Sequence, residues 1–311
     1  FDRDFVSPTL SSRITKFLID SGRFLSVFSD LSLSRDKYKP FFISNLYDSS
    51  GSRIYSVSRG GVYSPRVIRG GVSYLGRVSA VVSLDLLDKI VSEAGSVNRF
   101  ELSLGGSVVS GYVSIESIEA IHDLDLVKID LSDKALIRFL TPTIIPSKIF
   151  LPPSLANKPR YKRLESSNLL IPTIGAIIAY SIRLWNSVAP PEKRFTYPND
   201  DDSLYVYKTS VLGTVGSEVF SYRLRPVTVA VGRDREGRLR EARGFVGEIL
   251  FKIHHKRIRE IAEKTLAVAR YLGIGRSRGI GLGEIEIVSI KRESSEAREN
   301  TRRSIQGDPD E

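Results

Sequence analysis

The sequence predicts an α+β protein made of two ferredoxin-like units in tandem, followed by a short charged tail. Three observations predict this fold: the order strand, helix, hairpin, helix, strand occurs twice, an amphipathic helix precedes the last strand, and a glycine-rich loop joins the two. The order is the β-α-β-β-α-β pattern of a ferredoxin-like fold. We expect the first unit over residues 1–130 and the second over residues 131–290. Residues 291–311 are charged and poor in apolar residues, so we expect them to be disordered.

The first unit contains a helix that the spacing of apolar residues predicts over residues 9–20. Leu10, Ile14 and Leu18 recur at helical spacing. The strand that should precede this helix has room only within residues 4–7. Alternating β-branched residues and turn residues predict the other elements of this unit. These are strands at 41–43, 53–57 and within 62–85, a helix at 84–94 and a hairpin at 100–121.

The second unit has longer and more apolar elements. Residues 169–188 form a strongly apolar stretch of helical length, in which Tyr180 and Trp185 are expected in the core. Residues 254–272 are amphipathic, with one apolar face at helical spacing. The other predicted elements are a strand at 135–140, a hairpin of 223–231 and 240–253, a final strand at 284–290, and loops at 155–168 and 190–203.

The chain is basic, and its charge is concentrated near the C-terminus. It has 311 residues, with 46 Lys and Arg against 36 Asp and Glu, and a formal net charge of +10. Between residues 221 and 278 there are 15 basic residues and 6 acidic ones. Such a concentration is typical of proteins that bind a polyanion, either a nucleic acid or an anionic membrane. A basic structural protein unrelated to RNA is the alternative that charge alone leaves open.

The absence of cysteine excludes several kinds of site. Without Cys there is no disulfide, no thiolate nucleophile and no Cys-based zinc site, and this composition predicts a protein of the reducing cytoplasm. The chain also has no Met, and depletion of both residue types is typical of hyperthermophile proteins. No run of 18 apolar residues occurs, so no membrane-spanning helix is expected.

The most specific motif is the glycine-rich segment over residues 273–283. Five glycines stand at odd positions, with two arginines between them. Glycine lets a backbone approach a ligand closely, and exposed amides beside arginine can bind phosphate. We therefore expect this loop to hold the phosphates of a nucleic acid. The residues predicted to bind are Gly273, Gly275, Gly279, Gly281, Arg276 and Arg278.

Two other glycine motifs do not fit this segment. A dinucleotide fingerprint lies after a strand and before a helix, whereas this loop follows a helix and precedes a strand. A P-loop needs Gly-Lys followed by Ser or Thr, and the sequence contains no such triplet. A plain helix-to-strand connection explains one or two of the glycines, but not five with interleaved arginines.

The segment from Tyr271 to Glu284 resembles the C-terminal signature of the CRISPR-associated endoribonucleases that process precursor CRISPR RNA, a family of the RAMP superfamily. Residues 39–44 and 243–247 are similar to two strands of the same family, and the resemblance extends over about residues 7–290. It implies tandem ferredoxin-like domains with CRISPR repeat RNA bound over a basic surface and cut to mature crRNA. It also implies chemistry without a metal or cofactor, in which the 2′-hydroxyl attacks the adjacent phosphate and leaves 2′,3′-cyclic phosphate and 5′-hydroxyl ends.

Many members of that family place a histidine in or near the first helix, and this chain has none there. Its histidines are His122, His254 and His255, and the last two are expected in the capping region of the last helix rather than as metal ligands. The reaction needs proton transfer and stabilisation of the phosphorane charge, so lysine and arginine become the candidates. The predicted catalytic residues are Lys16 and Lys39 as the leading pair, then Arg13 and Arg243, and the further RNA contacts are Lys37 and Tyr38.

Alternatives stay open for these residues and for the function. Arg13 and Lys16 lie one turn apart on the polar face of the first helix, which is also the pattern of a solvated surface. An endoribonuclease is the leading hypothesis, and the missing histidine keeps open an alternative, a non-catalytic RNA-binding subunit of a CRISPR effector complex. Other effector-complex proteins are then expected partners besides repeat RNA. The sequence leaves open whether the chain forms a homodimer.

Overall fold

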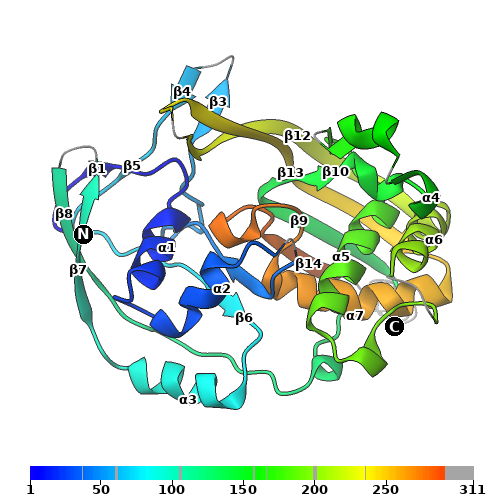
Figure 1. Cartoon of the computed structure of the whole chain (residues 1–311), viewed down its shortest axis with the longest axis horizontal. Coiled ribbons are helices and arrows are strands. Elements are labelled where there is room, and N and C mark those ends of the chain that lie inside the picture. Colours follow the sequence, from blue (N-terminus) through cyan, green and yellow to red (C-terminus); the bar gives the residue numbers. More distant parts are fainter. Residues whose placement is uncertain are drawn as a thin grey trace, which may run out of the picture.

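A computed structural model describes most of the chain. The described residues are 1–36, 38–59, 62–104, 107–156, 158–165, 167–198, 202–234 and 236–290. Two halves lie side by side, the N-terminal half in blue and cyan and the C-terminal half in green to orange (Figure 1). The predicted disordered tail over 291–311 lies outside the described residues. Among the described residues, no helix has the length and apolar character needed to cross a membrane.

The C-terminal half forms an antiparallel sheet with the ferredoxin-like order of elements. Across the sheet the last strand lies beside the first, and the third and second strands follow. All three neighbouring pairs are antiparallel. The elements in chain order are β9 (Lys134–Thr143), α5 (Ile174–Val188), β12 (Ser217–Arg233), β13 (Leu239–Ile253), α7 (Lys256–Leu272) and β14 (Ile285–Ile290). The β-α-β-β-α-β pattern predicted for this half is confirmed.

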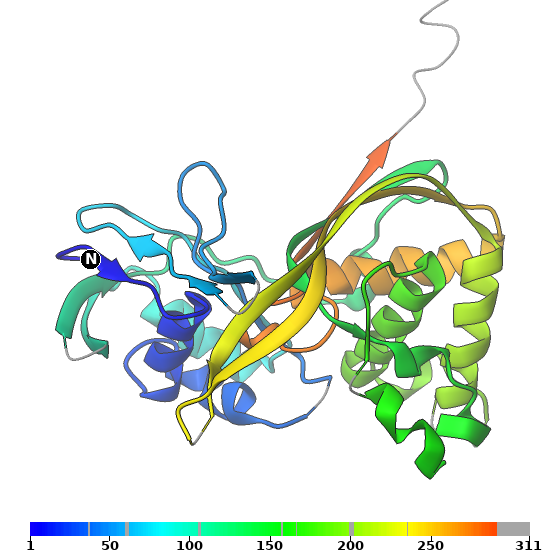
Figure 2. The same ribbon diagram turned by 90° about the horizontal axis from the view of Figure 1, so that it is seen from above.

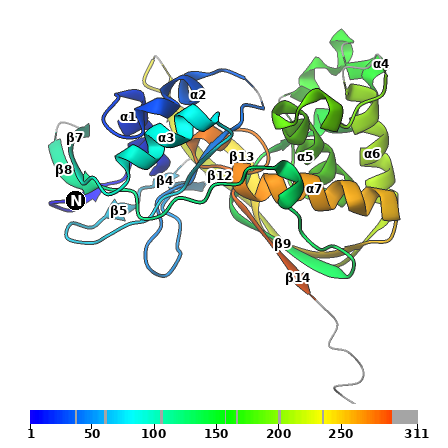
Figure 3. The ribbon, with the colours of Figure 1, turned by 90° about the horizontal axis from the view of Figure 1, so that it is seen from below.

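Helices α5, α7 and α6 (Ser203–Val215) pack together beside this sheet (Figure 3). Tyr180 and Trp185 are each 1% exposed, which confirms their predicted place in the core. Helix α5 begins later than predicted because the side chain of Thr173 caps it by accepting a hydrogen bond from the Ala176 amide. Helix α6 was not predicted, because its apolar residues do not gather on one face and so leave no periodic signal.

The N-terminal half repeats the order of elements with shorter strands. Its elements are β1 (Phe5–Val6), α1 (Ser12–Asp20), β2 (Phe41–Ile43), β6 (Val78–Ala80), α3 (Leu84–Glu93) and β7 (Asn98–Leu104). The first strand lies within the predicted window, and Leu18, Phe41 and Ile43 belong to a buried cluster of this half. The chain thus has two ferredoxin-like units in tandem. A division after residue 130 stays a prediction, and Val127 and Ile129 pack in the C-terminal core.

The strand pairing in the N-terminal half does not follow the order of the strands along the chain. Strand β2 pairs with β6, and not with residues 53–57 across the nearby turn. The predicted strand at 53–57 instead contributes isolated bridges, because alternation of side chains does not choose the partner of a strand. The hairpin predicted over 100–121 is confirmed as β7 with β8 (Ser107–Val113), but it is shorter. The remaining elements here are η1 (Ser26–Phe28), α2 (Ser29–Leu33), β3 (Val57–Arg59), β4 (Val62–Ser64), β5 (Val67–Ile68) and η2 (Leu124–Leu126).

The long β12–β13 hairpin joins the two halves, and Figure 2 shows it reaching from one to the other. Strand β3 pairs with β12, with Ser58 opposite Thr228, so a strand of the N-terminal half extends the C-terminal sheet. A buried cluster at this junction contains Leu10, Val229 and Leu282. The remaining elements are β10 (Ile145–Pro146), η3 (Ser147–Phe150), α4 (Pro153–Ala156), η4 (Pro159–Glu165), β11 (Asn168–Leu169), η5 (Pro191–Lys193) and η6 (Arg278–Ile280).

Candidate functional site

Lys16 and Lys39 come together at the carbonyl of Ser32, although they are distant in sequence. Lys16 extends from the middle of α1, and its Nζ donates to Ser32 Oγ at 2.5 Å and to Ser32 O at 3.1 Å. Lys39 stands just before β2, and its Nζ donates to Ser32 O at 2.7 Å and to Ser34 O at 3.2 Å. Both ammonium groups therefore share one acceptor, and the structure brings the predicted leading pair into one site.

The surroundings of Lys39 favour proton transfer. Burial lowers the pKa of Lys39, and the charges of Lys16 and Arg278 lower it further, while Asp20 and Asp36 oppose them. Asp20 also forms an ion pair with Lys16 at 3.0 Å. A lysine with a lowered pKa donates its proton more readily than an ordinary lysine. Within this pair, Lys39 is therefore the better candidate for an acid, and Lys16 for a fixed positive charge.

The glycine-rich loop (residues 273–283) is packed between the two halves. Gly273, Gly275, Gly279 and Gly281 are all buried, and each has protein atoms where a side chain would begin. At Gly281, whose φ is +88°, a Cβ atom would lie 2.6 Å from Asn45 Nδ2. The sequence predicted these glycines as phosphate contacts. The structure instead places them against protein, because the loop fills the junction of the halves.

Arg278 also differs from the prediction. The sequence predicted an RNA contact, but this side chain is 3% exposed. Its Nη1 donates to Leu272 O at 2.8 Å, and its Nη2 donates to Lys39 O at 2.9 Å. Direct contact of Arg278 with a phosphate stays a prediction that this geometry does not favour, because both ends of the guanidinium already bind carbonyls.

Tyr38 and Arg276 lie on the other side of the loop. Tyr38 packs against Tyr180 with ring centroids 5.4 Å apart, and burial raises the pKa of its phenol. Tyr180 donates to Gly275 O at 2.6 Å, which ties the loop to α5. Arg276 is only half-buried, and its charge acts on both phenols. Tyr38 and Arg276 are both half-buried, and their predicted RNA contacts stay predictions. The predicted contact at Lys37 lies outside the described residues.

Arg13 is separated from the lysine pair in spite of its position on α1. Its Nη2 donates to the carbonyl of Val231, at the end of β12. Burial lowers the pKa of Arg13, and the charge of Arg240 adds to this effect. Arg13 therefore fastens α1 to the β12–β13 hairpin. Arg13 and Lys16 lie one turn apart on the helix, but their side chains bind different partners.

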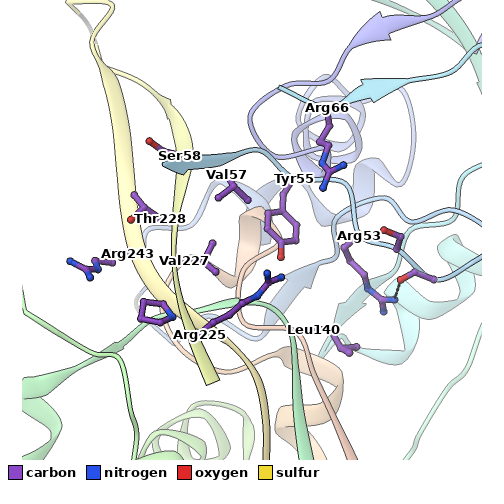
Figure 4. A pocket seen from close by; sticks show the side chains of 13 residues that line it. Arg53, Tyr55, Val57, Ser58, Arg66, Leu140, Arg225, Val227, Thr228 and Arg243 are labelled. Atoms are coloured by element: carbon purple, nitrogen blue, oxygen red, sulfur yellow. Dashed lines mark hydrogen bonds between the residues drawn. The ribbon is translucent and has the colours of Figure 1, made fainter. Parts of the chain in front are cut away.

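Arg243 lines a pocket of about 580 Å³ between residues 51–66 and the β12–β13 hairpin (Figure 4). Arg225 and Arg66 lie on either side of Tyr55, and their charges oppose the effect of burial, which raises the pKa of this phenol. No acidic side chain of the described chain lines this pocket. The sequence predicted no role for Arg53, Arg66, Arg225 and Tyr55, because only the folded chain brings these segments together.

Arg53 forms one wall of this basic pocket and is held by a buried carboxylate. Its Nε and Nη2 donate to Glu284 at 3.0 and 2.8 Å. The side chain of Glu284 is 4% exposed, and Arg77 lies 3.9 Å from the same carboxylate. The hydrogen bonds that Arg53 donates to Glu284 raise the pKa of Arg53. This two-pronged pair links the N-terminal half to the start of β14 and fixes the pocket wall.

The histidines lie at the edge of the C-terminal half. His255 caps α7, since its Nδ1 accepts from the Ile258 amide at 3.4 Å, and His254 pairs with Glu218 at 3.0 Å. The predicted capping position of these two residues is confirmed. In the part of the chain that the structure describes, no three His, Asp or Glu side chains gather in a way that could hold a metal ion.

Comparisons with known proteins agree over nearly the whole chain. A family model of the Cas6 N-terminal domain matches residues 1–119, and a model of the CRISPR-associated endoribonuclease Cas6 matches residues 137–285. Two relatives from Saccharolobus solfataricus bear the names CRISPR-associated endoribonuclease Cas6 2 and Cas6 1. The first is 35% identical over 298 residues and the second 34% over 304 residues, each covering 94% of this chain and 95% of the relative.

Solved structures share the fold at lower identity. A Cas6 product complex has a TM-score of 0.56 at 18% identity, covering 93% of this chain and all of the other. Thermus thermophilus Cas6 has a TM-score of 0.50 at 15% identity, covering 92% of this chain and 96% of the other. These similarities support the tandem ferredoxin-like architecture, and the two Saccharolobus relatives indicate an archaeal, thermophilic origin.

Proposed function

The chain belongs to the Cas6 family of CRISPR-associated endoribonucleases, and from this premise we propose that it cuts CRISPR repeat RNA without a metal, using Lys39 and Lys16. In the proposed reaction the 2′-hydroxyl oxygen forms a bond to the adjacent phosphorus while the bond from phosphorus to the 5′-oxygen breaks. The 2′-hydroxyl proton passes to solvent water, the leaving 5′-oxygen takes a proton from Lys39, and Lys39 regains a proton from solvent. The products are a 2′,3′-cyclic phosphate and a 5′-hydroxyl.

The shared Ser32 carbonyl is the observation that carries this proposal. Two ammonium groups that donate to one oxygen can also donate to the oxygens of one phosphate. We assign Lys39 the proton for the leaving 5′-oxygen, because burial and neighbouring charges lower its pKa. We assign Lys16 the stabilisation of charge on the phosphorane. Substrate oxygens would replace the Ser32 and Ser34 oxygens as acceptors.

The basic pocket supports a separate role in binding. Arg225 and Arg66 flank the half-buried Tyr55, and Arg243, which is exposed on the same hairpin as Arg225, lines the same pocket. Exposed arginines beside an aromatic ring suit a phosphate backbone and an unstacked base. We propose that the pocket holds part of the repeat RNA away from the scissile bond, and that Arg276 adds a contact near the lysines. Binding to effector-complex proteins and formation of a homodimer stay predictions.

Incubation with labelled repeat RNA in EDTA tests the proposal. We expect one defined cut, a cyclic phosphate on the 5′ fragment, and no cut when a 2′-deoxynucleotide stands before the scissile phosphate. Lys39→Ala and Lys16→Ala should slow cleavage more than they weaken binding, whereas Lys89→Ala on the exposed surface of α3 should match the parent chain. Tight binding without any product would favour the non-catalytic RNA-binding subunit instead. Loss of activity in EDTA that Mg²⁺ restores would overturn the metal-independent mechanism.

A further inference from the structure

We propose that Arg278 and Gly279 are positioning residues that hold Lys39 in its catalytic place, so that the glycine-rich loop acts through Lys39 rather than on the RNA. The proposal rests on the proposed function, because it assumes that Lys39 takes part in cleavage. This positioning role differs from the phosphate binding that the composition of the loop predicts. Three observations carry it: the bonds of Arg278, the space at Gly279 and the anchoring of the loop.

Arg278 holds the backbone of Lys39. One guanidinium joins Leu272 O, at the end of α7, to Lys39 O, just before β2, with distances of 2.8 and 2.9 Å. The two bonded carbonyls belong to different halves of the chain. A buried arginine that binds two carbonyls in this way fixes the distance between them. The position of the Lys39 backbone is thus set from the C-terminal half.

Gly279 holds the side chain of Lys39 by leaving room for it. A Cβ atom at residue 279 would lie 2.9 Å from Cε and 3.1 Å from Nζ of Lys39. The glycine backbone therefore lies directly against the end of this side chain, and any larger residue pushes the ammonium away. The Nζ also lies 5.6 Å from the centre of the Phe41 ring. Loop, ring and Ser32 carbonyl thus contact the ammonium group together.

The loop can serve as this reference because it is fastened to both halves. Ser12 Oγ donates to Ile280 O at 2.6 Å, and Asn45 Nδ2 donates to Gly281 O at 2.6 Å. On the other side, the Arg276 amide donates to Ile144 O at 2.9 Å. Ser12 begins α1, so the loop is also fastened to the first helix of the N-terminal half. The charge of Arg278 also acts on Lys39, together with those of Lys16, Asp20 and Asp36.

A double-mutant cycle separates this role from a general effect on the fold. We expect Gly279→Ala and Arg278→Gln each to lower the single-turnover cleavage rate about 10- to 100-fold, as displaced catalytic groups do, with RNA affinity within about twofold. In a chain that already carries Lys39→Ala, neither change should slow the residual reaction further, because residues that act through one group are not additive. Arg278→Lys keeps the charge but cannot reach both carbonyls, so it should not restore the rate.

The possible failures are distinguishable. If Lys39→Ala leaves the rate unchanged, the catalytic role proposed for Lys39 fails, and the positioning role fails with it. If Lys39→Ala slows cleavage but the Gly279→Ala and Arg278→Gln penalties persist in its background, the loop acts on the fold in general and the positioning proposal alone is wrong. If either loop variant instead weakens RNA binding with a normal rate at saturation, the loop contacts the RNA directly. Gly279→Ala keeps the inference testable if Arg278→Gln fails to fold, since residue 279 has an ordinary backbone conformation.

Discussion

The lysine pair and the arginine pocket are both basic, but they hold their charges in opposite ways. Lys16 and Lys39 donate to carbonyls of the protein, and burial lowers the pKa of Lys39. Arg225 and Arg243 are exposed on a hairpin and line an open pocket. A partly buried cation that is hydrogen-bonded to the protein is suited to proton transfer. An exposed cation is suited to attracting phosphates, and salt screens this attraction. In the proposed function, RNA cleavage and RNA binding therefore belong to different parts of this molecule.

The largest effect should come from removing the acid of the lysine pair. We expect Lys39→Ala to lower the single-turnover cleavage rate about 1000-fold, within the range that general acid catalysis contributes. RNA affinity should change less than about threefold, since one partly buried cation adds little to binding. Rapid-quench cleavage and filter binding measure the two quantities, with Lys89→Ala as the matched control. If Lys39→Ala lowered the cleavage rate and the RNA affinity by the same factor, the lysine pair would not differ in function from the arginine pocket.

Glu284→Gln should come next, because it breaks the pair that holds the wall of the arginine pocket. Removal of one partner of a buried ion pair leaves the other charge unpaired, so the free energy of unfolding should fall by about 3 kcal/mol. The exposed pair Arg99–Glu101 provides the control, since Glu101→Gln should change stability by less than about 0.5 kcal/mol. Urea unfolding measures both. If Glu284→Gln left the free energy of unfolding unchanged, Arg53 would not be anchored by this carboxylate.

A smaller effect is expected from the pocket itself. The double change Arg225→Ala and Arg243→Ala should weaken repeat-RNA binding roughly tenfold and reduce the slope of log affinity against log salt by about 2. The rate at saturating protein should stay unchanged, because neither arginine has a contact with the lysine pair in the described structure. Arg99→Ala serves as the control for loss of a surface charge. An unchanged salt slope would exclude the pocket from the RNA path.

The smallest effect is a displacement of the pH profile. If Lys39 acts in its protonated form, the rate at saturating RNA falls as pH rises through its pKa, which lies below the ordinary lysine value. Lys16→Gln removes a nearby positive charge and should move this fall to higher pH. Asp20→Asn removes a negative charge and should move it to lower pH. If both variants moved this fall in rate to the same side of the pH scale, the fall would not be due to Lys39.

Local patterns predicted much of the fold. The tandem order of elements, the apolar helix around Trp185, the capping histidines and the long hairpin near the C-terminus all follow from spacing and composition. Helix α6 was missed because its apolar residues lie all around it. The partner of β2 was missed because alternation identifies a strand but not its neighbour.

The candidate site was predicted in part. Lys16 and Lys39 were singled out from the sequence, and the structure places both at Ser32. The arginines of the pocket were mostly missed, since Arg53 and Arg225 come from segments that only the folded chain brings together. Composition also suggested a phosphate-binding loop, whereas the glycines are packed against protein.

By itself, the sequence determined the family, the basic character and the order of helices and strands, because propensity, periodicity and charge are properties of short segments. Only the tertiary structure decided what each cation does. Arg278 and Lys39 meet across 239 positions, and one buried guanidinium binds a carbonyl from each half of the chain. The charge of a side chain can be read from the sequence, but its burial and its partners depend on residues that lie far away along the chain.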